Sequence, residues 1–413
     1  MRLRYGTPYW LDDARSRDVP RFARLRSNLN SDVVIIGGGF TGCAAAHTFA
    51  SAGIDVVVLD RARLGHGSAS ASTALLMQET DCSFIELRRR YGLARARTIW
   101  RVSAQSVADL VRLATTLNCD LQFARSLQIA RDLHGVRQLR REFVARKTAG
   151  FAATWLDDTK LEQSTGIMGA AAIASPGNAV VNPYRLTLAL AESAAGVGAR
   201  VFEYSPALHV TPDRKGVTVT TPAGTVRATY AIIATGFATP EFKPLMTRFK
   251  TRTTYVLATE RVSARERARL GNGRTMFVDT DRPYHYFRWT RDGRILLGGT
   301  DRPVPKTSAA RRTALIEATS ALEETLEKLL PTVASFRISH AWDGLFATTP
   351  DSLPYIGPHR RYPRHLFALG YGGNGMTFGF LAGHVLLRHV LERPLATDAL
   401  FRFNRFRERK RRR

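Results

Sequence analysis

The sequence contains little cysteine, little lysine and no long apolar run. Its three cysteines, Cys43, Cys82 and Cys119, have neither CxxC spacing nor a histidine at ligand spacing, which argues against a disulfide framework and a zinc site. No uninterrupted apolar run approaches the ~20 residues that cross a bilayer. Residues 1–30 carry scattered arginines and lack the apolar core of a secretory signal. These absences predict a cytoplasmic protein without a bound metal.

Acidic residues are also few. The 413 residues include 61 basic and 35 acidic side chains, which gives a net charge of +26, and only eight of the basic residues are lysine. Such an excess can serve a nucleic acid, an anionic membrane surface or an acidic protein partner. The excess can also reflect arginines spread over a solvated surface. That alternative explains why arginine outnumbers lysine, but it does not explain why basic residues outnumber acidic ones. We favour the solvated surface and keep nucleic acid as a second possibility.

Residues 32–60 follow the pattern of a βαβ unit, in which a helix connects two parallel strands. Apolar runs rich in β-branched residues over 32–36 and 55–60 predict two buried strands, and the small residues over 43–50 predict the helix between them. The turn that opens this helix has the spacing Gly-x-Gly-x-x-Gly. Directly after a strand and before a helix, this spacing predicts a dinucleotide-binding turn.

Each glycine of this turn has its own physical purpose. Gly37 permits the tight turn, Gly39 lets a pyrophosphate approach the backbone, and Gly42 lets helix and strand pack closely. The amino end of the helix attracts the anion. Asp60 ends the second strand, where a carboxylate accepts hydrogen bonds from ribose hydroxyls. The alternative is a phosphate-free turn with incidental glycines, which we set aside.

The chain after Asp60 distinguishes between dinucleotides. An NAD domain would continue with regular βα units, whereas residues 61–73 form a loop of small and hydroxyl residues. Such residues suit a close approach of the backbone to a second part of the same cofactor. The β-rich stretch before Gly236 also resembles the insertion found in FAD proteins. We therefore predict FAD rather than NAD.

Periodicity elsewhere predicts a mixture of helices and short strands. Helices are expected over 84–118, 136–149, 183–197, 308–330 and 376–391, and strands over 121–131, 200–204, 207–212, 216–221, 225–227, 231–236 and 365–369. An Asp-Gly turn at 292–293 predicts a hairpin between residues 284–289 and 295–299.

Five segments carry a resemblance to a known family. They are DVVIIGGGFTG, VVVLDRARLGHGSAS, AIIATGFA, TPDSLPYIG over Thr349–Gly357, and LGYGGNGMT over Leu369–Thr377. Together they resemble the FAD-dependent oxidoreductases of the D-amino-acid oxidase superfamily, which includes glycine, sarcosine and gamma-glutamylputrescine oxidases. The resemblance covers residues 30–395, and the last two segments, in this order, are its most specific part.

The resemblance implies an α/β fold with two discontinuous domains. A Rossmann-like FAD-binding domain would comprise residues 30–85, 150–240 and 336–396. An α+β substrate domain, based on a mostly antiparallel sheet, would comprise residues 86–149 and 241–335. An N-terminal arm over 1–29, packed through its aromatic residues, and a basic tail over 397–413 would complete the chain.

The cofactor residues follow from the motifs and the resemblance together. The resemblance implies that the glycine run over 372–377 lies against the pyrimidine end of the flavin, where its N–H groups and the following helix dipole stabilise negative charge. The expected FAD-binding residues are Gly37, Gly39, Phe40, Thr41, Gly42, Asp60, Arg61, Gly67, Ser68, Ala69, Ser70, Gly236, Gly372, Gly373, Asn374, Gly375, Met376 and Thr377.

One departure from the family pattern concerns the substrate. In amino-acid oxidases of this superfamily, an arginine before the TPD-type segment pairs with the substrate carboxylate, but Phe346 falls at about that position here. The resemblance therefore favours an alkylated amine, such as one like gamma-glutamylputrescine, over a simple amino acid. Arg288 on the hairpin is a possible substitute anchor, with a surface arginine as the equal alternative.

Aromatic residues on the same hairpin are candidates for the substrate pocket. Tyr284 and Tyr286 share one strand face, and His285 and Phe287 share the other. In the family this sheet covers the substrate, so one pair is expected to line the pocket. Together with Arg288, Tyr284 and Tyr286 are our expected catalytic-site residues, and Tyr255 is a weaker candidate.

The resemblance also implies the reaction. A neutral amine would pass a hydride to flavin N5, leaving an imine that water hydrolyses. The electron acceptor, O2 or a quinone, stays open; the hairpin around Leu296 offers no lysine like the one that sarcosine oxidases use for oxygen. Without a cysteine in the C-terminal half, a thioether to the flavin is excluded, and His66 in the flavin loop is expected to be a hydrogen-bond partner. The FAD is therefore expected to be non-covalent.

Two other functions are compatible with the charge. The superfamily contains a flavin domain that trims a modified tRNA nucleoside, but no RNA-binding fold or partner methyltransferase domain is visible here. The tail, in which Phe401, Phe403 and Phe406 alternate with arginines up to Arg413, could instead rest on anionic lipid and support electron transfer to a quinone.

Overall fold

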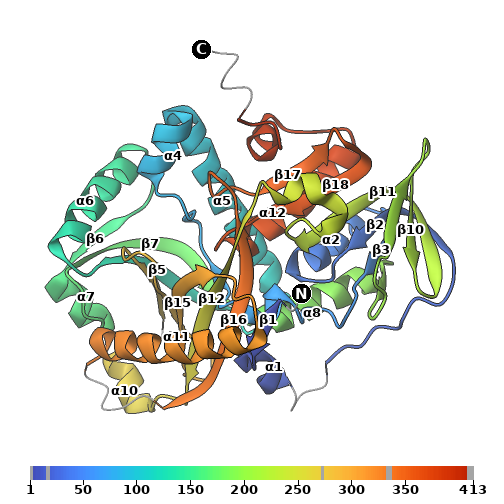
Figure 1. Ribbon diagram of the computed structural model, residues 1–413. Helices are drawn as coiled ribbons and strands as arrows, with labels where there is room; N and C mark the ends of the chain where they lie inside the picture. The colour runs from blue at the N-terminus through green and yellow to red at the C-terminus, as the bar shows by residue number, and fades with distance from the viewer. Residues whose placement is uncertain (1–2, 15–18, 271–273, 332–336, 407–413) are drawn as a thin grey trace.

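The computed structural model describes residues 3–14, 19–270, 274–331 and 337–406. Two sheets dominate the described chain (Figure 1). One lies with its helices on the right of Figure 1, and the other forms the left half above the long helix α11 (Ser308–Leu329). This mixed α/β architecture, in which one sheet has a parallel centre and the other is mostly antiparallel, confirms the predicted fold class.

The smaller, eight-stranded sheet contains the predicted βαβ unit. Its order is β17-β18-β11-β2-β3-β8; in addition, β10 pairs with β11 and β9 pairs with β10. The strands are β2 (Leu29–Ile36), β3 (Val56–Leu59), β8 (Arg200–Phe202), β9 (His209–Pro212), β10 (Val217–Thr221), β11 (Gly224–Gly236), β17 (Tyr355–His359) and β18 (Tyr362–Leu369). Strands β8, β3, β2, β11 and β18 pair in parallel, so their carboxyl ends meet at one edge.

Small residues let three helices pack closely on this sheet. Helix α2 (Phe40–Ala50) contacts both α8 (Pro183–Gly196) and α12 (Gly375–Val390). A Cβ at Gly379 of α12 would lie 2.6 Å from the Thr41 hydroxyl, and one at Gly383 would lie 3.1 Å from a backbone Cα of α2. The two glycines therefore set the close approach of α12 to α2.

The larger, ten-stranded sheet is mostly antiparallel. Its order is β1-β16-β12-β15-β14-β13-β5-β7-β4, and β6 pairs with β7. The strands are β1 (Arg4–Gly6), β4 (Leu75–Leu76), β5 (Gln122–Ala130), β6 (Thr154–Asp157), β7 (Ala171–Val180), β12 (Lys250–Thr259), β13 (Thr275–Asp279), β14 (Tyr286–Trp289), β15 (Ile295–Pro303) and β16 (Ile338–Thr348). The pairing of β14 with β15 confirms the predicted hairpin.

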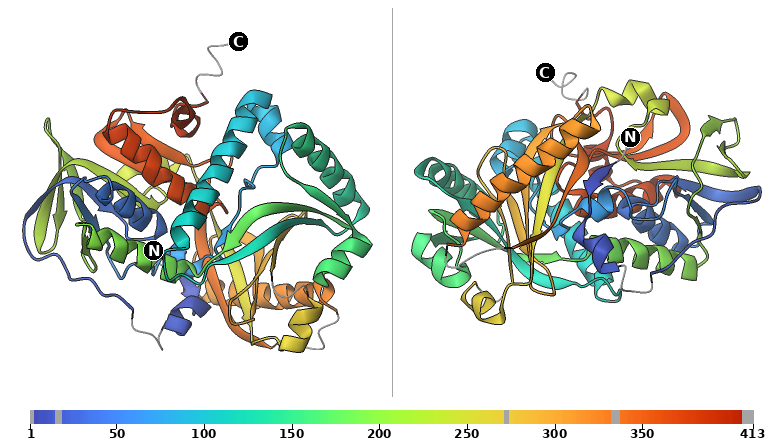
Figure 2. Two further views of the ribbon diagram at one scale, coloured as in Figure 1. Left: turned by 180° about the vertical axis from the view of Figure 1, so that it is seen from behind. Right: turned by 60° about the horizontal axis from the view of Figure 1, so that its bottom comes forward.

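Helices cover this sheet and join it to the smaller one. Helix α5 (Leu93–Ala114) contacts both α12 and β7, so it runs along the junction of the two halves (Figure 2). The helices not yet named are α1 (Tyr9–Asp13), α3 (Ser68–Ala71), α4 (Phe84–Tyr91), α6 (Leu133–Thr148), α7 (Asp158–Thr165), α9 (Lys243–Met246) and α10 (Ala264–Arg269). The helices predicted over 84–118 are α4 and α5, which are divided at Gly92, a residue with a φ of +79°.

Strand pairing differs from the expected segment boundaries at several places. Residues 150–240 were expected in the FAD-binding domain, but β6 and β7 belong to the larger sheet. Strand β16 was expected with the smaller sheet and pairs instead with β12, and β1 from the arm adds an edge strand beside β16. Strand periodicity indicates a strand and its faces but not its neighbour, so the sequence could not distinguish these pairings. The strands predicted over 225–227 and 231–236 are one continuous strand, β11.

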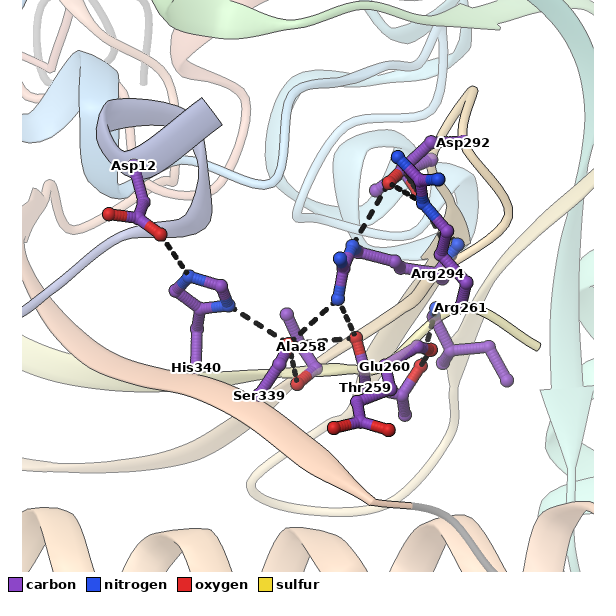
Figure 3. Close-up of polar contacts among 11 residues, drawn as sticks. Asp12, Ala258, Thr259, Glu260, Arg261, Asp292, Arg294, Ser339 and His340 are labelled. Carbon is purple, nitrogen blue, oxygen red and sulfur yellow. Dashed lines mark hydrogen bonds and ion pairs between the residues drawn. The ribbon is translucent and has the colours of Figure 1, made fainter. Parts of the chain in front are cut away.

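The N-terminal arm is held by aromatic and polar contacts. Trp10 is 2% exposed and its indole N–H donates to the carbonyl of Ser72, which confirms packing through aromatics. Figure 3 shows His340 of β16 between the carboxylate of Asp12, 3.3 Å away, and the hydroxyl of Ser339. The arm is therefore fixed to the larger sheet at both β1 and α1.

The C-terminal tail does not offer its phenylalanines to a membrane. Phe401 is completely buried and Phe403 is 6% exposed, stacked on Tyr355 with ring centroids 4.7 Å apart. Phe406 also packs against the core of the smaller sheet. The possible lipid contact of these three residues is therefore wrong, because they pack into the fold. Residues 407–413 lie outside the described chain. No described helix has the length and apolar character of a membrane span.

Candidate active site

The first glycine turn joins β2 to α2 as the motif predicts. Gly37 has a φ of +111°, which favours glycine. A Cβ at Gly42 would overlap the carbonyl oxygen of Gly37, whereas a Cβ at Gly39 would meet no atom within 4 Å. Gly42 is thus a packing residue and Gly39 faces open space. No side chain caps the start of α2, so its first N–H groups are free to bind an anion.

The second glycine turn joins β18 to α12. Gly370 and Gly372 have positive φ, and a Cβ at Gly375 would meet no atom within 4 Å. The Asp81 carboxylate accepts a 2.7 Å hydrogen bond from the N–H of Gly373, and the Asn374 side-chain oxygen accepts one from the N–H of Asp81. The turn is therefore held by the segment that precedes α4.

Both turns line one cavity of about 1940 Å³. Of the expected FAD-binding residues, those that line it are Gly37, Gly39, Phe40, Thr41, Asp60, Arg61, Gly67, Ser68, Ala69, Gly236, Gly372, Gly373, Asn374, Gly375 and Met376. Gly42, Ser70 and Thr377 do not. The hydroxyls of Ser70 and Thr377 instead donate to the carbonyls of Gly67 and Met77, so these residues support the turns from behind.

Asp60 lies at the carboxyl end of β3, as predicted. Its two carboxylate oxygens accept 2.7 Å hydrogen bonds from the N–H groups of Gly38 and Ala62. Burial raises the pKa of Asp60 above its ordinary value, against the lowering effect of these two hydrogen bonds. The carboxylate therefore stabilises the first glycine turn while it lines the cavity.

The loop over 61–73 is held in place by hydrogen bonds with two strands of the larger sheet, β1 and β16. The Ser68 hydroxyl donates to the carbonyl of Leu345, and Arg4 donates to the carbonyl of His66. His66 contacts the Tyr184 hydroxyl at 3.2 Å. Burial, together with the charges of Arg4 and Arg63, lowers the pKa of His66 to about 4, so its imidazole is neutral near pH 7.

Tyr284 and Tyr286 line the cavity from the larger sheet. The Tyr286 hydroxyl contacts that of Thr254 at 2.7 Å, and its ring occupies the space over Gly298. Asp279 holds the turn that contains Tyr284: its carboxylate accepts a hydrogen bond from the N–H of His285 and contacts a ring nitrogen of the same residue at 2.7 Å. Of the two pairs left open by periodicity, His285 and Phe287 do not line the cavity.

Arg288 is not an anion anchor in the cavity. Its side chain is fully enclosed, donates to the carbonyls of Thr73, Val181 and Trp289, and lies over the Trp10 ring. It shares a strand face with Tyr286, but the N-terminal arm covers that face here, so the expectation was wrong. Tyr255 of β12 points away from the cavity and is fully buried in a hydrophobic cluster on the other side of the larger sheet. It does not line the pocket either.

Besides Asp279, the carboxyl groups of Asp81 and Asp301 line the cavity near the tyrosines, and no sequence motif indicated either of them. Asp81 is accessible from the cavity but enclosed by protein; burial, opposed by the bond from Gly373 and reinforced by Asp301, raises its pKa to about 7. Burial also raises the pKa of Asp301. Neither residue belongs to a recognisable motif: Asp81 is placed by its hydrogen bonds with the turn at Gly373 and Asn374, and Asp301 by the pairing of β15.

The cavity also has walls that no motif indicated. Residues 3–7 of the arm line it, as do Arg252 and Thr254 of β12. Alternation along β12 could have separated these two from the buried Tyr255, but only the sheet order shows which face meets the cavity.

The geometry fits an elongated dinucleotide cofactor. Two uncapped helix starts, α2 and α12, adjoin the same cavity, and each offers unpaired N–H groups to negative charge. A Cβ at Gly39, Gly236 or Gly375 would meet no protein atom within 4 Å. The backbone at three separate positions is thus open to close approach by a bound group, as FAD requires.

Comparisons with known proteins agree with this geometry. Residues 32–388 match the family model described as FAD dependent oxidoreductase (DAO). The chain is 28% identical to glycine oxidase of Bacillus licheniformis over 384 residues, covering 89% of this chain and 95% of that protein. It is 27% identical to gamma-glutamylputrescine oxidoreductase of Escherichia coli strain K12 over 388 residues, covering 90% and 87%.

A solved structure of a glycine oxidase has a similar fold. Glycine oxidase from Geobacillus kaustophilus is similar with a TM-score of 0.76 at 22% sequence identity, covering 92% of this chain and 99% of that one. The family match extends from β2 to α12 and includes both glycine turns. The chain therefore belongs to the DAO family of FAD-dependent oxidoreductases, and FAD is its cofactor.

Proposed function

We propose that the protein oxidises the C–N bond of a small amine or an N-substituted amino acid. The observation that carries the proposal is one cavity lined both by the two glycine turns and by Tyr284 and Tyr286. When bound, FAD supplies at N5 the acceptor for a hydride from the carbon beside nitrogen. The resulting imine is hydrolysed by water to a carbonyl compound and the shorter amine.

The chain's own residues contribute orientation and electrostatics. Tyr284 and Tyr286 offer two ring faces and two hydroxyls that can pack against an alkyl chain and position its nitrogen. Burial, with the nearby carboxyls of Asp81 and Asp301, holds the pKa of Tyr284 well above its usual value. The hydroxyl is therefore protonated near neutral pH and available as a hydrogen-bond donor.

A spectrum of the purified protein followed by anaerobic titration tests the proposal. We expect the absorbance of oxidised flavin and its bleaching by at least one member of a panel of N-alkyl amines and N-substituted amino acids. Product analysis should find one carbonyl compound and one shortened amine per flavin reduced. A flavin that no member of the panel bleaches would refute amine oxidation without affecting the cofactor assignment.

We expect the FAD to be non-covalent. His66, the histidine of the loop over 61–73, has its Nε2 within 3.2 Å of the Tyr184 hydroxyl. The three cysteines, Cys43, Cys82 and Cys119, are buried and lie outside the C-terminal half. Acid precipitation should leave all flavin in the supernatant and a protein mass equal to that of the bare chain. Yellow colour that stays in the pellet would contradict this expectation.

Substitution of Asp81 should change the flavin potential in a pH-dependent way. The raised pKa, about 7, makes Asp81 neutral below that pH and negative above it. If the turn over 372–377 lies against the flavin, as in the family, this charge disfavours the reduced cofactor. Asp81→Asn should therefore raise the midpoint potential by tens of millivolts at about pH 8.5 and hardly at all at about pH 5.5.

Anaerobic spectroelectrochemical titration at both pH values measures this difference. Asp158→Asn, on the exposed start of α7, is the matched control and should leave the potential unchanged. An equal shift at both pH values would mean that Asp81 does not ionise in this range, and no shift at either would remove it from the flavin environment.

A further inference from the structure

Arg252 is an exposed cation inside the cavity. It lies on β12, lines the cavity, and its guanidinium makes no hydrogen bond or ion pair with another described residue. Arg282, which also lines the cavity, donates through one guanidinium nitrogen to the carbonyl of Asp281. All the donors of Arg252 remain available to a ligand, because none of them is used within the described chain.

Strand register places Arg252 beside Phe346. The two residues are directly paired across antiparallel strands β12 and β16, so their side chains lie on the same sheet face. Thr254, two residues along β12, shares this face and contacts the Tyr286 hydroxyl. The face that carries Arg252 is thus the face that carries the tyrosines.

Asp301 supplies an opposite charge near this guanidinium. The two side chains interact electrostatically, and one carboxylate oxygen of Asp301 is buried without a hydrogen-bond partner among the described residues. The attraction orients Arg252 into the cavity, while the absence of a direct hydrogen bond leaves the planar fork of the guanidinium available.

We propose that Arg252 binds a carboxylate of the substrate. A carboxylate matches the paired N–H donors of a guanidinium, and such charge-assisted bonds are strong in an enclosed site. Phe346 stands where amino-acid oxidases of the superfamily carry the arginine that binds the substrate carboxylate. Arg252, its partner on the adjacent strand β12, supplies a cation in its place. The inference rests on the proposed function and narrows its substrates to amines that also carry a carboxylate.

Titration of the FAD-loaded enzyme with acetate, propanoate and butanoate tests the assignment without turnover. These ligands should perturb the flavin absorbance saturably. Arg252→Met should raise their dissociation constants at least tenfold, and Arg252→Lys by less, because an ammonium keeps the charge but loses the fork. Lys250→Met is the matched control on the same strand; Lys250 is exposed and does not line the cavity, so its dissociation constants should equal those of the wild type.

An exchange of the two paired residues gives the stricter test. The double variant Arg252→Phe with Phe346→Arg moves the cation to the neighbouring strand and should restore carboxylate binding relative to Arg252→Met. Wild-type dissociation constants in Arg252→Met, or no perturbation of the wild-type flavin by any of the three carboxylates, would overturn the assignment.

A matched substrate pair separates this inference from the proposed function. N-methylglycine and dimethylamine differ by one carboxylate, and Arg252→Met should lower the preference for the first, measured as a ratio of kcat/KM, at least tenfold. An unchanged ratio would overturn the role of Arg252 while amine oxidation stands. Failure of every amine to bleach the flavin would refute amine oxidation, and the carboxylate titration would still decide whether Arg252 binds anions.

Discussion

Gly39→Ala is expected to release FAD without destabilising the protein fold. A Cβ at Gly39 meets no protein atom within 4 Å, and the residue has an extended φ of −80° that alanine adopts freely. The added methyl group instead occupies the space that the bound pyrophosphate needs beside the amino end of α2. We expect FAD affinity to fall roughly a hundredfold and the free energy of unfolding of the apoprotein to stay within about 0.5 kcal/mol of the wild type.

Gly42→Ala is the matched comparison, because the same methyl group should act on the fold instead. Its Cβ would overlap the Gly37 carbonyl oxygen, which belongs to the backbone and cannot turn away. We expect a loss of about 3 kcal/mol or more in the free energy of unfolding. Flavin content after gel filtration and urea unfolding of the apoprotein measure both effects. Equal destabilisation by the two substitutions would contradict the distinct purposes assigned to the glycines.

Arg405→Met is expected to be among the most destabilising single changes in the C-terminal region. The buried guanidinium donates 2.7 Å hydrogen bonds to both oxygens of Asp351 and lies 4.0 Å from the centre of the Tyr355 ring. It also donates to the carbonyls of Leu353 and Pro354. Its removal leaves a buried carboxylate without its cation, which costs about 3–5 kcal/mol.

The pH dependence of this loss follows from Asp351. Burial alone would raise its pKa, but the hydrogen bonds and charge of Arg405 outweigh burial and hold it below the ordinary value. A lowered pKa contributes stability above the unfolded-state value of about 3.9 that is lost as the pH falls through the folded-state value. The difference between wild type and Arg405→Met should therefore be largest near pH 7 and shrink below about pH 4.

Urea unfolding across this pH range measures the effect. Arg402→Met, three residues away on an exposed side chain, is the control and should change stability by no more than about 0.5 kcal/mol. The double change Arg405→Met with Asp351→Asn removes the stranded charge and should recover part of the loss. A pH-independent loss would mean that packing on Tyr355, and not the ion pair, is the main contribution of Arg405.

The sequence by itself determined the cofactor turn and its place on the fold. The first turn could be predicted because tight backbone geometry selects glycine and buried parallel strands select β-branched residues, both of which are local requirements. Gly37, Gly39 and Asp60 line the cavity as expected. The positions of α8, α11 and α12 also agree with their predicted ranges to within a residue, since helix caps and periodicity are read along one segment.

Only the tertiary structure decided what each strand face meets. Tyr286 and Arg288 are two residues apart on β14 and so share one face, yet the first lines the cavity and the second is covered by Trp10. Likewise, no local pattern pairs Arg252 with Phe346; the antiparallel register of two strands about 90 residues apart does. Periodicity fixes the direction of a side chain relative to its own strand, whereas its neighbours depend on sheet order and register, which arise from contacts between distant segments.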